Sequence, residues 1–340
     1  MQFLLFRPGF SIIILQQRML LLMMISLYLS GCQDTKAIHE DPMDMIVSAA
    51  DSSGAFIMIL GTVQDAGSPQ IACQKACCIP LYSNPDFTRK VVSLGLIDSD
   101  NNRSYLFEAT PDIASQLDLL RRNSGDTTKS VPDGVFLTHA HIGHYTGLMY
   151  LGAEAMNATE VPVYAAPKMR EFLSSNGPWD QLVSYNNLSL QQVTPDSVFD
   201  LSSQLRVKAF RVPHRDEYSE TVGWKIYGPH KSALFIPDID KWEKWDTDIT
   251  EVIKEVDYAF LDATFYDNNE LKNRDMSEIP HPFVVESMMK FSALTAEQKQ
   301  KIYFIYFNHT NPLFIQESVQ SKKVLDNGFG IARFGERFVL

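Results

Sequence analysis

The sequence is poor in basic residues. It contains 30 lysines and arginines against 41 aspartates and glutamates, which gives a formal net charge of −11. Proteins that hold nucleic acid through phosphate contacts usually present a basic face, and no segment of this chain supplies one. The composition therefore argues against nucleic acid as a partner and favours a small-molecule substrate, since an acidic surface otherwise concerns solubility.

The interior of the chain also lacks a linker, a charge block and a repeat of fixed period. A length of 340 residues would allow one large domain or two small ones. A hydrophobic content of 45% and an aromatic content of 11% are sufficient for a sizeable core. We therefore expect one globular domain.

The apolar stretch near the N-terminus is shorter than the ~20 residues that a membrane-spanning helix needs. It follows Arg18, covers residues 19–29 and stops at Leu29-Ser30-Gly31-Cys32. A basic flank, a short apolar core and small residues before a cleavage point are typical of a secretory signal. The ending resembles the bacterial lipobox, which implies cleavage before Cys32 and lipidation of this cysteine. An uncleaved anchor helix is the alternative.

These features divide the chain into three parts. We expect a lipoprotein signal peptide over residues 1–31, an irregular acidic tether over 32–54 and the folded domain over 55–340. The mature protein would then be exported and lipid-anchored to the bacterial cell envelope, on its periplasmic or cell-surface side. The membrane would be a partner through this anchor.

Apolar, β-rich segments recur through the domain, and helical patterns fall between several of them. The expected strands are Phe56–Leu60, Val91–Ile97, Tyr105–Phe107, Val135–Thr138, Val161–Ala165, Leu205–Val212, Val222–Tyr227, Ala233–Ile236, Tyr258–Leu261 and Ile302–Phe307. The expected helices are Ile113–Arg122, Thr146–Ala155, Lys168–Ser174, Ile249–Val256 and Val284–Phe291. Strands in bunches that then alternate with helices indicate an α/β domain, an αββα sandwich of two packed mixed sheets with helices outside.

A cluster of histidines follows one of these strands. The apolar segment Val135–Thr138 leads directly into His139-Ala140-His141-Ile142-Gly143-His144. His-x-His at the end of a strand places two imidazoles on the same side, because side chains alternate, and the next turn brings His144 back. Imidazole is the commonest ligand of first-row metals, so the cluster predicts a metal site. A solvent-facing histidine-rich loop is the alternative.

Three further potential ligands also follow apolar strands, and they are His214, Asp238 and His309. Taken singly, each is more often a structural polar residue than a ligand. Together with the histidine cluster they match the way in which a rigid sandwich presents metal ligands along one edge.

His-x-His-x-x-His followed by widely spaced His, Asp and His resembles the metallo-β-lactamase superfamily, from Ile57 to the C-terminus. The resemblance implies the metallo-β-lactamase fold, with His139, His141 and His214 on a first metal, Asp238 bridging, and His144 and His309 on a second. It also implies hydrolysis by a metal-bound hydroxide, with Asp238 and His144 as the catalytic residues.

One position departs from the family pattern. The usual motif is His-x-His-x-Asp-His, and Gly143 stands where the aspartate belongs. The second metal site should therefore be weaker, empty or completed from elsewhere. Asp65, in the loop 61–67, is one candidate carboxylate. Alternatively, Asp65 only shapes the turn beside Gly67.

Four other segments resemble the pyrroloquinoline-quinone biosynthesis protein B (PqqB-like) group. They are Leu60-Gly61-Thr62 with Gly67-Ser68-Pro69-Gln70, Ala109-Thr110-Pro111-Asp112-Ile113, Asp262-Ala263-Thr264-Phe265 and Thr310-Asn311-Pro312-Leu313. The histidine set of this chain is fuller than that of the biosynthetic protein. The favoured interpretation is therefore a hydrolase related to this group, and not the biosynthetic protein itself.

Cys73, Cys77 and Cys78 remain once Cys32 is lipidated. An odd number cannot pair completely, and a bond between adjacent cysteines would be strained. Three thiolates and one histidine form an ordinary closed zinc site. The resemblance implies such a structural zinc, with His281 as the fourth ligand. One disulfide and a free thiol is the alternative.

Carboxylates near the expected ligands could either support the metal site or serve only a structural role. Glu217 could orient a ligand histidine or relay protons, or it could be a solvated loop charge. Glu108 and Asp112 lie after a strand near where the family carries an acid behind the metal ligands, although hydrogen bonding of a turn is the slightly favoured explanation.

The leading hypothesis is a metal-dependent hydrolase that acts on an ester, phosphodiester or related bond of a small molecule. We expect one or two zinc ions in the active site and one structural zinc. The alternatives are an iron-dependent oxidative enzyme, since imidazole and carboxylate also suit iron, and a degenerate exported binding protein. Metal identity and oxygen consumption distinguish the first two.

Overall fold

A computed structural model describes residues 54–124, 126–271 and 275–340 of the chain. The expected signal peptide (1–31) and residues 32–53 of the expected tether, Cys32 among them, lie outside the described residues. Within the described part, no helix has both the length and the apolar character needed to cross a membrane.

The first sheet has seven strands, and β1 is buried along its whole length. Their order is β14 (Arg337–Val339), β1 (Ala55–Gly61), β2 (Ser93–Asp98), β3 (Arg103–Phe107), β4 (Gly134–Phe136), β5 (Val161–Ala165) and β6 (Leu188–Gln192). The pairs from β14 to β3 are antiparallel, and the pairs from β3 to β6 are parallel.

The second sheet also has seven strands and is mixed in the same way. Their order is β13 (Gly330–Ile331), β12 (Ile302–Ile305), β11 (Tyr258–Asp262), β10 (Ser232–Ile236), β9 (Val222–Tyr227), β8 (Arg206–Arg211) and β7 (Val198–Asp200). The pairs from β13 to β10 are parallel, and those from β10 to β7 are antiparallel.

The two sheets pack face to face through large aromatic side chains. Phe107 of the first sheet stacks on Phe136 at 4.7 Å between ring centroids. It also meets Trp224 and Phe235 of the second sheet edge to face, at 5.9 and 6.3 Å. All four rings are fully buried, and such offset or edge contacts add to the stabilisation that burial provides.

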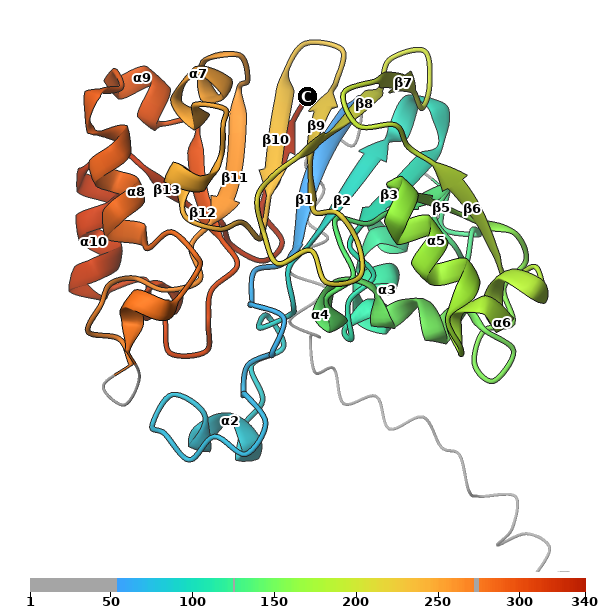
Figure 1. The fold of residues 1–340 in the computed structure, drawn as a ribbon, viewed down its shortest axis with the longest axis horizontal. Coiled ribbons are helices and arrows are strands. Elements are labelled where there is room, and N and C mark those ends of the chain that lie inside the picture. The colour runs from blue at the N-terminus through green and yellow to red at the C-terminus, as the bar shows by residue number, and fades with distance from the viewer. Residues whose placement is uncertain (1–53, 125, 272–274) are drawn as a thin grey trace, which may run out of the picture. The chain divides into compact units, whose positions relative to one another are not determined.

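Helices cover the outer face of each sheet, so the expected αββα sandwich is confirmed (Figure 1). The α-helices are α2 (Ile79–Ser83), α3 (Ile113–Asn123), α4 (Ile142–Tyr145), α5 (Pro167–Ser175), α6 (Trp179–Ser184), α7 (Ile249–Lys254), α8 (Val284–Lys290), α9 (Ala296–Lys299) and α10 (Val319–Asp326). The 3-10 helices are η1 (Ser99–Asn101), η2 (Thr146–Leu151), η3 (Trp242–Lys244), η4 (Met276–Glu278), η5 (Phe291–Ala293) and η6 (Pro312–Phe314).

The sandwich brings several strand ends to one edge. The parallel strands β10, β11 and β12 end at Ile236, Asp262 and Ile305, and their carboxyl ends therefore lie side by side. The segment after β4 joins them, because the amide of Val222 donates to the carbonyl of Thr138 over 3.1 Å. Loops that follow neighbouring carboxyl ends form the usual binding edge of such sheets.

Candidate metal centre

Three imidazoles and one carboxylate converge at this edge. Nε2 of His139 lies 2.8 Å from Nδ1 of His141, which in turn lies 3.1 Å from Nε2 of His214. Oδ2 of Asp238 is 3.5 Å from Nε2 of His139 and 3.3 Å from Nε2 of His214. Ligands on a tetrahedral zinc, at bond lengths of about 2.0–2.1 Å, stand about 3.3 Å apart. These four side chains therefore fit a metal ion as the sequence predicts.

The other nitrogen of each imidazole is held by a polar partner. Nδ1 of His139 pairs with the Thr138 hydroxyl at 2.8 Å. Nε2 of His141 pairs with Glu217 at 2.9 Å, and Nδ1 of His214 pairs with Asp240 at 3.2 Å.

These contacts fix which nitrogen of each ring faces the centre. Such partners orient ligand histidines and raise metal affinity. Glu217 is thus a positioning residue, whereas its neighbour Asp216 accepts a hydrogen bond from Thr221 and does not take part. Asp240 had no place in the sequence-based site, although it stands only two residues after Asp238.

The electrostatics of the centre favour a cation. Burial opposes ionisation of Asp238, but the positive charges of His214 and His281 hold its pKa well below the usual value. Burial likewise acts to lower the pKa of His214, but Asp238 and Asp240 outweigh it and raise this pKa to about 10. An environment that stabilises a proton on His214 also stabilises a metal ion in its place.

His144 lies behind this group instead of within it. Its Nδ1 is 3.1 Å from Glu108, and its Nε2 is 2.9 Å from the hydroxyl of Tyr306. His144, Glu108 and Tyr306 are all fully buried. Burial acts to lower the pKa of His144, but the Glu108 carboxylate reverses the effect and raises it. Both ring nitrogens are engaged in these contacts, although Nε2 also lies 3.7 Å from Oδ2 of Asp238, so the assignment of His144 as a ligand of the second metal stays a prediction.

Gly143 is required by close packing. A Cβ placed on Gly143 would overlap the Cβ of Asp65, so Asp65 fills the space that the family's aspartate side chain would take. Asp65 accepts a hydrogen bond from the Gln64 side chain. None of the potential metal-binding groups in the described part of the chain includes Asp65, so the geometry does not make it the replacement ligand.

His281 and His309 exchange the places that the sequence predicts for them. His309 joins Cys73, Cys77 and Cys78, whereas His281 joins Asp238 and Asp262. The strand end that should supply an active-site histidine carries Tyr306 instead, at a left-handed φ of 73°. His309 comes three residues later, beyond that turn, and therefore faces the cysteine loop.

The cysteine group fits a structural zinc. All three cysteines are free thiols in this structure, as a zinc site requires. Sγ of Cys77 and Sγ of Cys78 are 3.9 Å apart, close to the spacing of about 3.8 Å expected for thiolates on a tetrahedral zinc at a bond length of about 2.3 Å.

The histidine of this group is poised as the fourth ligand. Nδ1 of His309 pairs with the Asn308 amide oxygen at 3.0 Å. Its Nε2 is buried and has no hydrogen-bond partner. A buried nitrogen without a partner is costly, and zinc would satisfy it.

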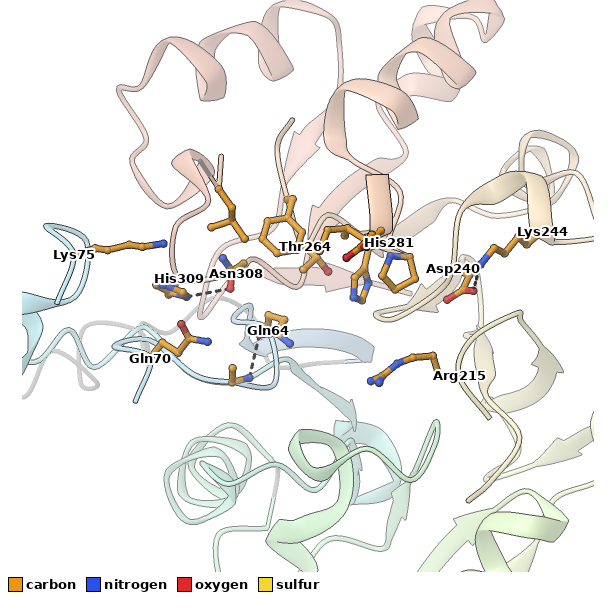
Figure 2. Close-up of a pocket in the computed structure, with 16 residues that line it drawn as sticks. Gln64, Gln70, Lys75, Arg215, Asp240, Lys244, Thr264, His281, Asn308 and His309 are labelled. Atoms are coloured by element: carbon orange, nitrogen blue, oxygen red, sulfur yellow. Dashed lines mark hydrogen bonds and ion pairs between the residues drawn. The ribbon is translucent and has the colours of Figure 1, made fainter. Parts of the chain in front are cut away.

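A cavity of about 640 Å³ opens beside the metal centre. Figure 2 shows Arg215 and Asp240 on one side of it, Lys75 and His309 on the other, and His281 between. Arg215 lies 3.5 Å from Nε2 of His141, so the cavity reaches the centre. Its lining also includes Lys244, which is paired with Asp240 at 2.7 Å.

Known proteins resemble this chain over most of its length. A family model described as a beta-lactamase superfamily domain matches residues 103–304, more than half of the chain. The coenzyme PQQ synthesis protein B of Ruegeria pomeroyi is 23% identical over 306 residues, covering 84% of this chain and 99% of that protein.

Two solved structures share the fold. Zn(2+)-bound PqqB from Methylobacterium extorquens has a TM-score of 0.68 and 22% identity, covering 84% of this chain and 100% of that one. A diphosphatase from the PhnP family has a TM-score of 0.57 and 21% identity, covering 84% of this chain and 96% of that one.

Proposed function

The chain belongs to the beta-lactamase superfamily, and we propose that it is a metal-dependent hydrolase of an ester, phosphodiester or related bond in a small anionic molecule. The observation that carries this proposal is the convergence of His139, His141, His214 and Asp238 beside an open cavity. A metal ion bound there would act as a Lewis acid and would lower the pKa of a water molecule.

The cavity supports an anionic substrate. Arg215, Lys75 and Lys244 line it, and Arg215 stands nearest to the ligand histidines. A guanidinium binds carboxylate and phosphate through paired hydrogen bonds. Arg215 would therefore hold the substrate anion against the centre, and Lys75 would take a second negative group at the far side.

The candidate residues divide into two roles. Asp238 lies within the cluster, and its side chain is 3% exposed, so it is the catalytic candidate. His144 is fully buried and reaches the centre only through Tyr306 and Asp238. It is therefore a positioning residue that keeps the Asp238 carboxylate in place.

The cofactor proposal is zinc at both sites. The relative from Methylobacterium extorquens was solved with bound zinc, and the cysteine group has the donor set of a structural zinc. Lipidation of Cys32 and attachment to the cell envelope also remain part of the proposal, on the sequence motif alone.

The proposal is tested on the purified full-length protein by elemental analysis followed by a screen of phosphodiesters and esters. We expect zinc and a hydrolytic activity that His214→Gln abolishes and that His230→Gln, at an exposed position, leaves unchanged. Arg215→Gln should raise KM for an anionic substrate roughly 10-fold, given about 1.5–3 kcal/mol for a hydrogen bond to a charged group. The absence of metal from the histidine centre would contradict the proposal.

One relative supports a second candidate function. An iron-dependent oxidative enzyme is the alternative, because imidazole and carboxylate ligands also suit iron and the chain resembles a coenzyme PQQ synthesis protein. Iron retained at the histidine centre together with oxygen consumption would favour it over hydrolysis.

A further inference from the structure

The two carboxylate oxygens of Asp238 face different groups of side chains. Oδ2 faces His139 and His214, at 3.5 and 3.3 Å, and accepts a hydrogen bond from the Tyr306 hydroxyl at 3.1 Å. Oδ1 is buried and makes no hydrogen bond. Nδ1 of His281 lies 3.3 Å from this oxygen. Oδ1 therefore has an ion-pair neighbour but no hydrogen bond, and a bound cation would satisfy this buried oxygen.

Asp262 completes a pocket of ligands on the Oδ1 side. Asp262 is fully buried, and its Oδ2 lies 2.8 Å from Nδ1 of His281. Amides of Ile239 and Thr264 donate to its two oxygens at 3.1 and 2.8 Å. These contacts fix the carboxylate, and one ligand atom each from Asp238, Asp262 and His281 lies within 4.8 Å of the others.

The charge of this pocket also calls for a cation. Two buried carboxylates, Asp238 and Asp262, share the single imidazole of His281. Buried charges in proteins are paired or coordinate metals. His139 and His214 also face Asp238, whereas Asp262 is paired with His281 alone among the residues described. A divalent ion would satisfy both carboxylates, with His281 supplying a nitrogen ligand in place of its proton.

The family pattern places a second metal between His144 and Asp238, and another side chain occupies that position. The Tyr306 hydroxyl stands between Nε2 of His144 and Oδ2 of Asp238, which are 3.7 Å apart. Asp65 fills the space beside Gly143, and His309 belongs to the cysteine group. On that side of Asp238, Nε2 of His144 is therefore already paired with Tyr306.

We propose that the second metal ion of this enzyme is displaced to the opposite side of Asp238, where Asp238, Asp262 and His281 bind it. Nitrogen and oxygen donors of this kind suit zinc, manganese or iron. Because His281 lines the cavity, the open coordination positions face the substrate. The inference deepens the proposed function, on which it rests for the first metal, and Asp238 would bridge the two ions.

Metal stoichiometry tests this inference without an activity assay. The full-length protein is stripped of metal, reloaded with Zn²⁺, passed through a desalting column and analysed for zinc per chain. We expect three zinc ions in the unaltered protein, one for each group of ligands. His281→Gln should bind two, and His230→Gln, a control at an exposed histidine, should still bind three.

Two further variants assign the remaining ions. Cys77→Ser and His139→Gln should each lose one zinc, and each should lose a second when combined with His281→Gln. Circular dichroism on every variant separates metal loss from unfolding. Two zinc ions in the unaltered protein, or three in His281→Gln, would overturn the proposal. Three zinc ions without hydrolysis would support the displaced metal site but contradict the proposed hydrolytic function.

Discussion

The hydroxyl of Tyr306 donates a hydrogen bond to Oδ2 of Asp238 over 3.1 Å and lies 2.9 Å from Nε2 of His144. Burial and the nearby Asp238 carboxylate raise the pKa of Tyr306 well above its usual value, so the phenol keeps its proton. This contact ties the metal-binding carboxylate to the buried pair of His144 and Glu108. The position and orientation of Asp238 therefore depend on this tyrosine.

Replacing Tyr306 by phenylalanine tests this link. The variant leaves Oδ2 of Asp238 and Nε2 of His144 without their shared partner, which should cost about 1–3 kcal/mol in the free energy of unfolding. Zinc affinity at the histidine centre should fall roughly 10- to 100-fold, as for other residues that orient metal ligands. Urea unfolding and zinc titration measure the two effects. Tyr185→Phe, at an exposed tyrosine, is the control, and equal behaviour of the two variants would contradict the role of Tyr306.

Glu217 offers a second test of ligand orientation. It pairs with Nε2 of His141 at 2.9 Å but is itself 48% exposed, so it contributes little to packing. Glu217→Gln should lower zinc affinity roughly 10-fold while the denaturation midpoint of the apoprotein stays unchanged. Competition with a chromophoric chelator measures the affinity. Glu243→Gln, also on the surface, should behave like the unaltered protein, and a matching loss there would remove the specific role of Glu217.

The histidine centre was predictable from the sequence because its ligands follow buried strands. His139, His214 and Asp238 each come directly after an apolar run, and the fold gathers such strand ends at one edge. His281 follows no strand and lies on the loop between β11 and α8. Its approach to Asp262 depends on tertiary packing, which no local pattern records. The exchange of His281 and His309 was therefore beyond the reach of residue spacing.

Most of the fold was also predictable, because most strands carry the apolar residues that identify a buried strand. The ten expected strands are present, whereas β6, β7, β13 and β14 were missed. β7 is largely exposed, and β13 has only two residues, so neither shows the apolar alternation that identifies a strand. The expected helix Thr146–Ala155 is instead the 3-10 helix η2, since Gly147 packs against the backbone of Thr110.

The cysteine group should control both stability and thiol reactivity. In the zinc-loaded protein, Cys73, Cys77 and Cys78 should not react with a thiol reagent such as DTNB, and chelation should expose all three. Burial raises the pKa of Cys78 to about 12, so its thiolate requires a cation beside it. Cys77→Ser should lower Tm, whereas His139→Gln, which loses the other zinc, should leave the thiols protected. Free reaction of the thiols in zinc-loaded protein would exclude a structural zinc.

A partly buried carboxylate outside the metal-binding groups should give the protein a pH-dependent stability. Burial raises the pKa of Glu270 from 4.5 to about 7, against the opposing hydrogen bonds from Thr310 and the Tyr266 amide. The folded state then holds a proton on Glu270 that the unfolded chain has released, between pH 4.5 and about 7. Stability should therefore fall as pH rises through this window, by at most about 1.4 kcal/mol per pH unit from this group.

Glu270→Gln removes the titrating group while it keeps the size of the side chain. The difference in unfolding free energy between variant and unaltered protein should then shift in favour of the variant as pH rises from 5 to 8, and should be constant above that range. Urea titrations at four pH values measure it. Glu297→Gln, on the exposed helix α9, should show no such trend. A difference that stays flat from pH 5 to 8 would mean that Glu270 is ionised in the folded protein at all these values.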